Sequence, residues 1–187
     1  MNSTATASLW ETESARWTAN EIARLRGVYC GPAAVAWIAA VWNANQGTSY
    51  DYLRRLQDKA LFPDGPRSFN NAIPFFKSSL NQILRRETNG QLELSSNRQF
   101  RYQDIHNRIA ANGMPFIVRI ALPSLRDGLH YATIFRTTLT DDKCTCYCQD
   151  NGVITGGKKI TEGITITAHS MRRAPFFAWG ARQVKVV

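Results

Sequence analysis

Residues 30–43 read CGPAAVAWIAAVWN, a cysteine followed by a proline and a long apolar run rich in alanine. Proline fits the first turn of an α-helix because its missing N–H would be unpaired there, so Pro32 predicts a helix that starts beside Cys30 and runs to about Asn43. This helix is apolar nearly all round and must be enclosed on most sides. We therefore expect a central helix, whose alanines let a sheet or a second helix approach its backbone closely.

The predicted helix places Cys30 at its N-terminus. The positive end of a helix lowers the pKa of a cysteine thiol, and the thiolate is the reactive form. A free cysteine is also often a small buried hydrophobe. The position alone makes Cys30 a candidate nucleophile and leaves the second interpretation open.

The rest of the chain divides into a helical first part and a strand-rich second part. Capping and turn residues predict further helices over residues 18–27, 50–60, 70–86 and 102–112. After Gly113, short apolar stretches between Gly, Pro and Asp predict strands over residues 115–122, 129–137, 143–150, 159–167 and 181–187. Helices first and strands second favour an α+β fold with an antiparallel sheet. The length of 187 residues, with no low-complexity linker, indicates a single domain over residues 1–187.

Composition and charge narrow the class of protein. The chain has 23 Lys and Arg against 14 Asp and Glu, a net charge of +9. These basic residues are scattered over separate segments, so we do not expect nucleic acid as the main partner. The net positive charge is equally consistent with attraction to an acidic protein.

No apolar run reaches the roughly 20 residues of a membrane span. Residues 1–18 lack the basic start and apolar core of a secretory signal, so we expect export without a cleavable signal or as part of a larger polypeptide.

A thiol nucleophile needs a base, and the chain has three histidines. His106 lies in a polar stretch of a predicted helix, where we expect it to be solvated. His169 follows a predicted strand with no carboxylate close by in sequence. His130 opens the apolar strand after Asp127 and Gly128, which makes it the preferred candidate.

The predicted hairpin after His130 supplies a carboxylate. A turn centred on Thr140 pairs residues whose numbers add up to 280, which puts His130 opposite Asp150. Directly paired residues of an antiparallel ladder share a face, so this carboxylate would hold the imidazole in one tautomer. A slip of one residue brings Asn151 opposite instead, and Asn can also serve as the third member of a triad. Cys30, His130 and Asp150 are thus the candidate catalytic residues, with Asn151 as the alternative to Asp150.

The three remaining cysteines alternate along one predicted strand, at Cys144, Cys146 and Cys148. Structural zinc sites use longer gaps and a second pair of ligands, so we expect neither a metal nor another cofactor. Neighbours on one strand face do not pair easily, which argues against disulfides. We interpret these cysteines as small buried residues that let the central helix lie close.

Four short segments together resemble the papain-like cysteine peptidases. They are residues 29–34 (YCGPAA), 112–118 (NGMPFIV), 129–134 (LHYATI) and 149–152 (QDNG). Within that group the chain is similar to the domains with which bacterial ABC exporters trim bacteriocin leaders, and to related interbacterial toxin domains. The resemblance implies a papain-like fold, with the nucleophile at the start of a central helix packed on a C-terminal antiparallel sheet. It also implies that Cys30 attacks, that His130 is base and then acid, that Asp150 orients His130, and that the Cys30 backbone N–H helps to bind the oxyanion.

The sequence departs from the exporter domains at two places. Arg24 and Tyr29 stand where those domains carry a glutamine of the oxyanion hole and an acidic residue, so another donor would have to replace the glutamine. The chain also has no transporter segment and looks more like a free-standing toxin. The resemblance therefore implies a cysteine endopeptidase effector that is delivered by a secretion system, cleaves a protein in the cytoplasm of a target bacterium, and is neutralised in the producer by a cognate immunity protein.

Three other functions remain open. A transglutaminase or another acyltransferase would use the same Cys, His and Asp residues. A peptidoglycan amidase or endopeptidase of the same fold would act in the periplasm. A non-catalytic binding module would use the charge of +9 to contact an acidic partner, with Cys30 buried and inert.

Overall fold

A computed structural model of the chain describes residues 2–16, 30–48, 77–95, 102–121, 129–140, 144–149 and 177–184. These residues form an α+β fold whose strands pair antiparallel. The described helices are α1 (Ser8–Arg16), α3 (Cys30–Asn45), α5 (Lys77–Glu87) and α6 (Tyr102–Asn112). The strands are β1 (Ser3–Thr6), β2 (Leu92–Leu94), β3 (Phe116–Ala121), β4 (Leu129–Leu139), β5 (Cys144–Gln149) and β6 (Phe177–Gln183).

Most expected elements that fall within the described residues are confirmed. The central helix α3 begins at Cys30 and ends at Asn45, and α6 has the expected bounds with Gly113 directly after it at a φ of 62°. The last strand begins at Phe177, earlier than expected. Strands β1 and β2 and helix α1 were not predicted, so the order of helices first and strands second is wrong in detail. The expected helices over residues 18–27 and 50–60 and the strand over 159–167 lie outside the described residues.

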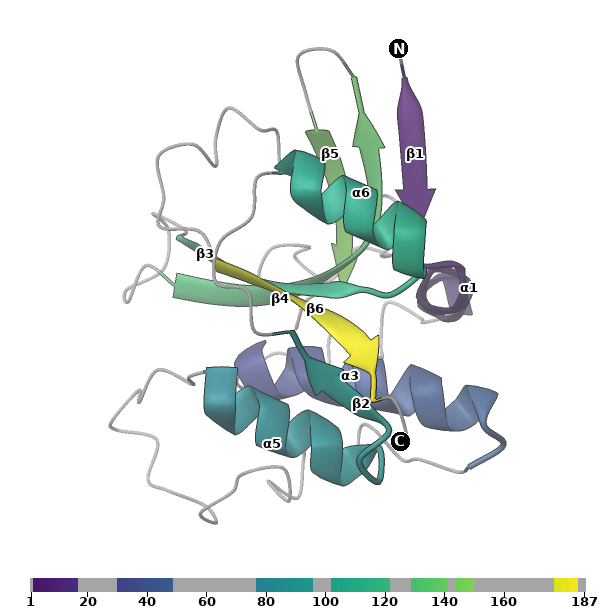
Figure 1. Cartoon of the computed structure of the whole chain (residues 1–187), viewed down its shortest axis with the longest axis vertical. Helices are drawn as coiled ribbons and strands as arrows, with labels where there is room; N and C mark the ends of the chain where they lie inside the picture. The colour runs from purple at the N-terminus through teal and green to yellow at the C-terminus, as the bar shows by residue number, and fades with distance from the viewer. Residues whose placement is uncertain are drawn as a thin grey trace.

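Strand β4 connects the parts of the sheet. The sheet has the order β1-β4-β3-β6-β2, and β5 pairs with β4. The first half of β4 pairs with β3 and its second half with β1, while β5 takes the opposite edge. A bulge between Ile134 and Arg136 separates the two halves, and bulges bend a strand. Figure 1 shows β4 passing from beside β3 to between β1 and β5.

The predicted register of the β4 and β5 hairpin is wrong. The observed partners include Ile134 with Cys148, Thr137 with Cys146, and Leu139 with Cys144. Each β5 residue pairs with a β4 residue later in the chain than predicted. The shift is two residues where β4 precedes the bulge and three residues where it follows the bulge. Strand β4 continues to Leu139, so the centre of the turn lies after Thr140. The bulge then reduces the shift in register from three residues to two. The ladder therefore does not support a direct pairing of Asp150 with His130.

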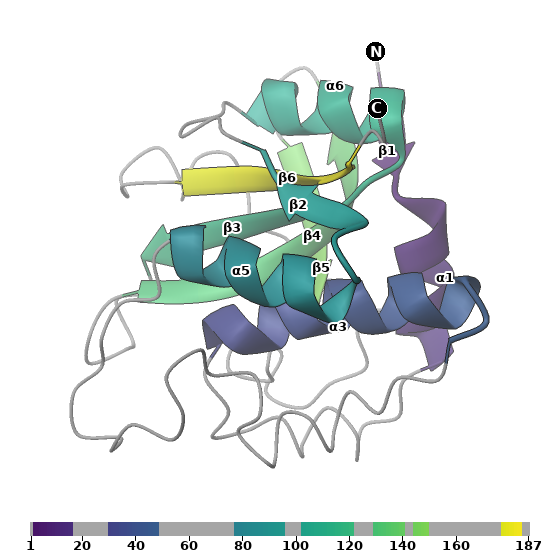
Figure 2. The same cartoon turned by 60° about the horizontal axis from the view of Figure 1, so that its bottom comes forward.

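The helices cover both faces of the sheet. Figures 1 and 2 show α6 on one face and α3 with α5 on the other. Four alanines of α3 are at most 2% exposed, as expected for a helix packed closely on all sides. The largest fully buried side chains are Trp10, Trp37, Ile38, Leu80, Ile83, Leu84, Leu92, Ile105 and Ile109. Within the described ranges, no helix has the length and apolar character needed to cross a membrane.

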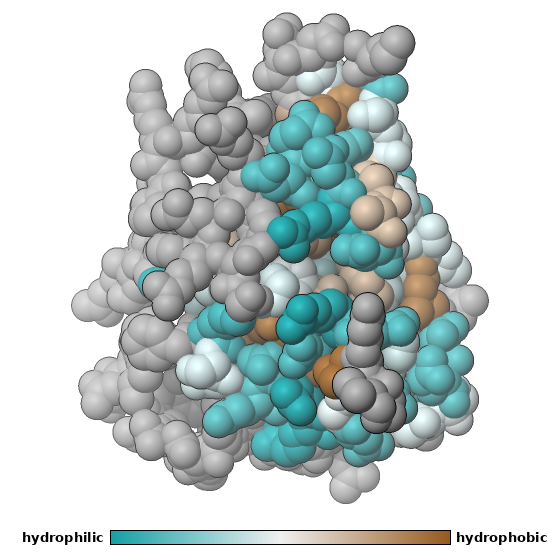
Figure 3. Space-filling view, in the orientation of Figure 1, coloured by the Kyte–Doolittle hydropathy of each residue, from teal (hydrophilic) through white to brown (hydrophobic). Residues whose placement is uncertain are grey.

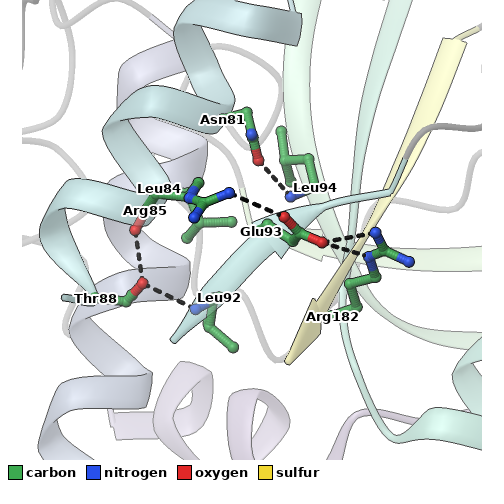
Figure 4. A network of polar contacts seen from close by, with 8 residues as sticks. All are labelled: Asn81, Leu84, Arg85, Thr88, Leu92, Glu93, Leu94 and Arg182. Carbon is green, nitrogen blue, oxygen red and sulfur yellow. Dashed lines mark hydrogen bonds and ion pairs between the residues drawn. The ribbon is translucent and has the colours of Figure 1, made fainter. Parts of the chain in front are cut away.

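A polar network holds the short edge strand β2 (Figure 4). The hydroxyl of Thr88 donates to the carbonyl of Leu84 at 2.7 Å and accepts the N–H of Leu92 at 3.1 Å. The side chain of Asn81 accepts the N–H of Leu94 at 2.6 Å. Side chains of α5 and its C-terminal turn thus satisfy the strand edge that β6 does not pair, which protects it from pairing with other chains.

Charged side chains form the outer part of this network. Glu93 lies 3.3 Å from Arg85 and 2.6 Å from Arg182, so one carboxylate connects α5, β2 and β6. Figure 3 shows the described surface in this view as mainly hydrophilic, with hydrophobic colour in small separate areas.

Candidate active site

Cys30 is the first residue of α3 and is partly buried against the core. Pro32 lies within the first turn, where the absence of an N–H leaves no helical hydrogen bond unmade. All four cysteines carry free thiols, and the other three are buried. Cys30 is thus the cysteine with access to solvent, at the end of a helix that favours negative charge.

The contacts between α3 and β4 show which strand residue faces Cys30. Thr133 donates its hydroxyl to the carbonyl of Ala34 at 3.3 Å, and further along the rings of Trp37 and Phe135 lie 6.1 Å apart. The helix and this part of the strand therefore run in the same direction. Cys30 lies four residues before Ala34, a distance of about 6 Å along a helix. Two residues of a strand span about 6.6 Å, so the strand residue level with Cys30 is the one two positions before Thr133.

That strand residue is Tyr131, which is 5% exposed. Its ring stacks on Trp179 with centroids 6.3 Å apart. Burial raises the pKa of the Tyr131 phenol, nearby Arg119 lowers it, and the charge of Cys30 raises it. The phenol therefore keeps its proton at neutral pH.

Arg119 is the cation of this group. It pairs across the ladder with Tyr131 on β4 and with Phe177 on β6, so it lies on the same face of the sheet as Tyr131. Its side chain is half-buried. Within the described part of the chain, its Nε is buried and has no hydrogen-bond partner. Neither Arg119 nor Tyr131 was predicted as a site residue, although a lone arginine inside the apolar strand FIVRIA is a signal for one.

His130 pairs through its backbone with Ile120, and its imidazole lies outside the side chains that the structure describes. Neighbouring residues of a regular strand face opposite sides of a sheet. The ladder therefore assigns the face that carries α3 to Tyr131 and Thr133. Asp150 and Asn151 lie outside the described residues. So do Arg24 and Tyr29, the two positions at which the sequence differs from the exporter domains.

His106 is not solvated as expected but buried, at 6% exposure. Its Nε2 lies 3.0 Å from the Ser3 hydroxyl and its Nδ1 3.0 Å from the Thr137 hydroxyl. Burial lowers the pKa of His106. Its two ring nitrogens are used in binding β1 and β4 to α6, so His106 has a structural role. His169 lies outside the described residues.

The three cysteines of β5 are small buried residues, as expected, but they pack on a different side of the sheet. Cys148 pairs with Ile134, whose neighbour Thr133 faces α3. Because strand residues alternate, Cys148 lies on the face that carries α6. Cys146 pairs with Thr137, which bonds to α6 through His106. These cysteines therefore do not make room for the central helix.

The thiols of Cys144 and Cys146 are 4.0 Å apart. Their hydrogen bond lowers the pKa of Cys144 and raises that of Cys146, which burial raises further. Among the residues described, no group of three or more His, Cys, Asp or Glu side chains is arranged to hold a metal ion.

The site thus joins a partly accessible thiol at a helix N-terminus with a phenol and a guanidinium. No protein-family model, curated protein or solved structure matches this chain. The chemistry of these side chains is therefore the basis for assigning a function.

Proposed function

We propose that the chain is a papain-like cysteine hydrolase, an endopeptidase effector that cleaves a protein inside a target bacterial cell. The observation that carries the proposal is the position of Cys30. It begins α3, has access to solvent, and lies level with the start of β4. A thiol at a helix N-terminus is favoured as thiolate, and the thiolate is the nucleophile.

In the proposed reaction, Cys30 Sγ attacks the carbonyl carbon of the substrate peptide bond and its proton passes to His130. His130 then protonates the leaving amine, and water hydrolyses the thioester that remains on Cys30. On the resemblance alone, Asp150, or Asn151 in its place, is the proposed partner that holds His130 in the required tautomer, since the observed register of β4 and β5 does not pair Asp150 directly with His130. The Cys30 backbone N–H, at the unpaired start of α3, donates to the oxyanion.

The role of His130 carries a geometric requirement. Tyr131 and Thr133 occupy the α3 face of the ladder, and regular alternation assigns the opposite face to position 130. The proposed role therefore requires β4 to depart from regular alternation at its first residues, so that the imidazole reaches the thiol. The pH dependence of thiol labelling tests this requirement directly.

The proposed partners follow from the proposed activity. They are a protein substrate and a cognate immunity protein in the producing cell. The protein would be delivered without a cleavable signal and act in the cytoplasm of the target.

Expression in a bacterial cytoplasm tests the activity. We expect wild type to arrest growth and Cys30→Ala to be harmless at equal protein level. Cys144→Ala is the matched control, because it removes a buried thiol away from the site and should remain toxic. Equal toxicity of wild type and Cys30→Ala would favour a non-catalytic binding module instead. Toxicity only after export to the periplasm would favour a cell-wall hydrolase over the cytoplasmic endopeptidase.

Labelling of Cys30 with iodoacetamide tests the base. At about pH 6 an ordinary thiol is less than roughly 1% ionised. We expect Cys30 of the wild type to react at least about tenfold faster than a free cysteine at that pH, because a paired imidazole favours the thiolate. His130→Ala should lose this advantage and His106→Gln should keep it. An unchanged profile in His130→Ala would overturn the role of His130.

A further inference from the structure

Three strands bring side chains together at the end of the sheet that lies level with Cys30. Arg119 on β3 and Tyr131 on β4 are direct cross-strand partners, and Tyr131 stacks on Trp179 of β6. The Thr133 contact with Ala34 aligns this end of the sheet with the start of α3. The charges of both Arg119 and Cys30 influence the pKa of the Tyr131 phenol, which agrees with this alignment.

Arg119 differs from Arg136 and Arg182 in having no described counter-ion. Arg136 is 2.6 Å from Glu11, and Arg182 is 2.6 Å from Glu93. No described carboxylate forms an ion pair with Arg119, and its buried Nε has no described hydrogen-bond partner. The Nε of Arg136 is also buried without a hydrogen-bond partner, but the Glu11 carboxylate neutralises that arginine. Because an unsatisfied buried donor is costly and Arg119 has no described counter-ion either, an anionic ligand would satisfy both.

Tyr131 adds a second donor without adding negative charge. Since burial keeps its phenol protonated, the hydroxyl does not neutralise Arg119 and is by its chemistry a donor. A guanidinium and a hydroxyl together are well suited to a carboxylate, which accepts hydrogen bonds through two oxygens.

We propose that Arg119 and Tyr131 form an anion subsite beside Cys30 that binds an acidic side chain of the substrate, next to the bond that Cys30 attacks. The inference rests on the proposed function for its substrate, but the subsite itself is a property of the protein alone. It assigns the two residues a role in specificity.

Two alkylating reagents of opposite character test the subsite. Iodoacetate carries a carboxylate and iodoacetamide is its neutral analogue, and both form a bond from sulfur to carbon with release of iodide. Mass spectrometry of the Cys30 peptide gives the labelling rate with each reagent and separates Cys30 from the buried cysteines. The measured quantity is the ratio of the iodoacetate rate to the iodoacetamide rate.

We expect the ratio in wild type to exceed that of a free cysteine, and Arg119→Gln to lower it by about five- to twentyfold, as for loss of a charged hydrogen bond. Arg119→Lys should keep most of the preference, and Tyr131→Phe should lose part of it. Arg182→Gln is the matched control, since it removes the same charge from an exposed site, and should change the ratio by less than about twofold. Equal ratios in wild type and Arg119→Gln would overturn the proposal, as would failure of either reagent to label Cys30.

Competition in the wild type keeps the test valid if Arg119→Gln does not fold. Acetate should slow labelling by iodoacetate more than chloride of equal ionic strength does, and should leave iodoacetamide labelling unchanged. Equal effects of acetate and chloride would contradict the subsite. Because these rates do not depend on hydrolysis, an Arg119-dependent ratio in a protein without peptidase activity would support the subsite and overturn only the proposed function.

Discussion

His106 shows how a residue with a polar sequence neighbourhood becomes part of the core. Its partners Ser3 and Thr137 are 103 and 31 residues away in sequence. The local pattern of charged and amide residues predicted solvent, and nothing near residue 106 in sequence indicated that β1 and β4 would bring two hydroxyls to the imidazole. Long-range partners of this kind are the part of a site that a single sequence does not reveal.

The burial of His106 predicts a pH dependence of stability. Its pKa is lowered in the folded protein, so the unfolded chain binds the proton more readily. Its contribution is therefore fully present above the ordinary histidine pKa of about 6.5 and is lost as the pH falls below it. His106→Gln removes the titration, so between pH 7 and pH 5 the free energy of unfolding should fall less in the variant than in wild type. Urea unfolding at both pH values measures this, and equal losses would refute the role of His106.

Gly180 lets strand β6 pass close to Phe116 on β3. A Cβ at this position would lie 2.7 Å from the end of the Phe116 ring, which is itself buried. Gly180→Ala should therefore lower the free energy of unfolding by about 1–3 kcal/mol, the usual cost of overpacking. Urea unfolding measures the change. The double variant with Phe116→Leu should recover part of the loss, and strict additivity of the two changes would contradict the steric explanation.

Strand β2 depends on Thr88 more than on the ion pairs of Glu93. Thr88→Val keeps the shape but leaves the buried N–H of Leu92 without its acceptor, at a cost of about 1–3 kcal/mol. Glu93→Gln breaks contacts to two largely exposed arginines, at a cost of about 1 kcal/mol or less. Thermal unfolding of both variants should give the larger shift for Thr88→Val. The reverse order would show that the ion pairs hold the strand.

The hairpin of β4 and β5 marks the limit of prediction for elements. The existence of both strands followed from their alternating and apolar residues, but their register depended on where the turn falls and on the bulge after Ile134. Neither feature has a local signal in the sequence. The error affected function directly, because the pairing of His130 with Asp150 rested on that register.

At the scale of the whole molecule, the α+β class, the antiparallel sheet and the central helix could be predicted, because they follow from capping residues and hydrophobic pattern in long segments. The short strands β1 and β2 could not, since each is stabilised by distant partners rather than by its own residues. In the candidate site, Cys30 was found through Pro32 and the apolar helix. Arg119 and Tyr131 required the sheet to be assembled.

Cleavage by Cys30 is tested by comparing protein N-termini in bacterial cells that express either wild type or Cys30→Ala at equal levels. An endopeptidase with Cys30 as nucleophile predicts new N-termini in one or a few cellular proteins in the wild-type sample alone, with an acidic residue close to the cleaved bond. The same set of N-termini in both samples would contradict the account.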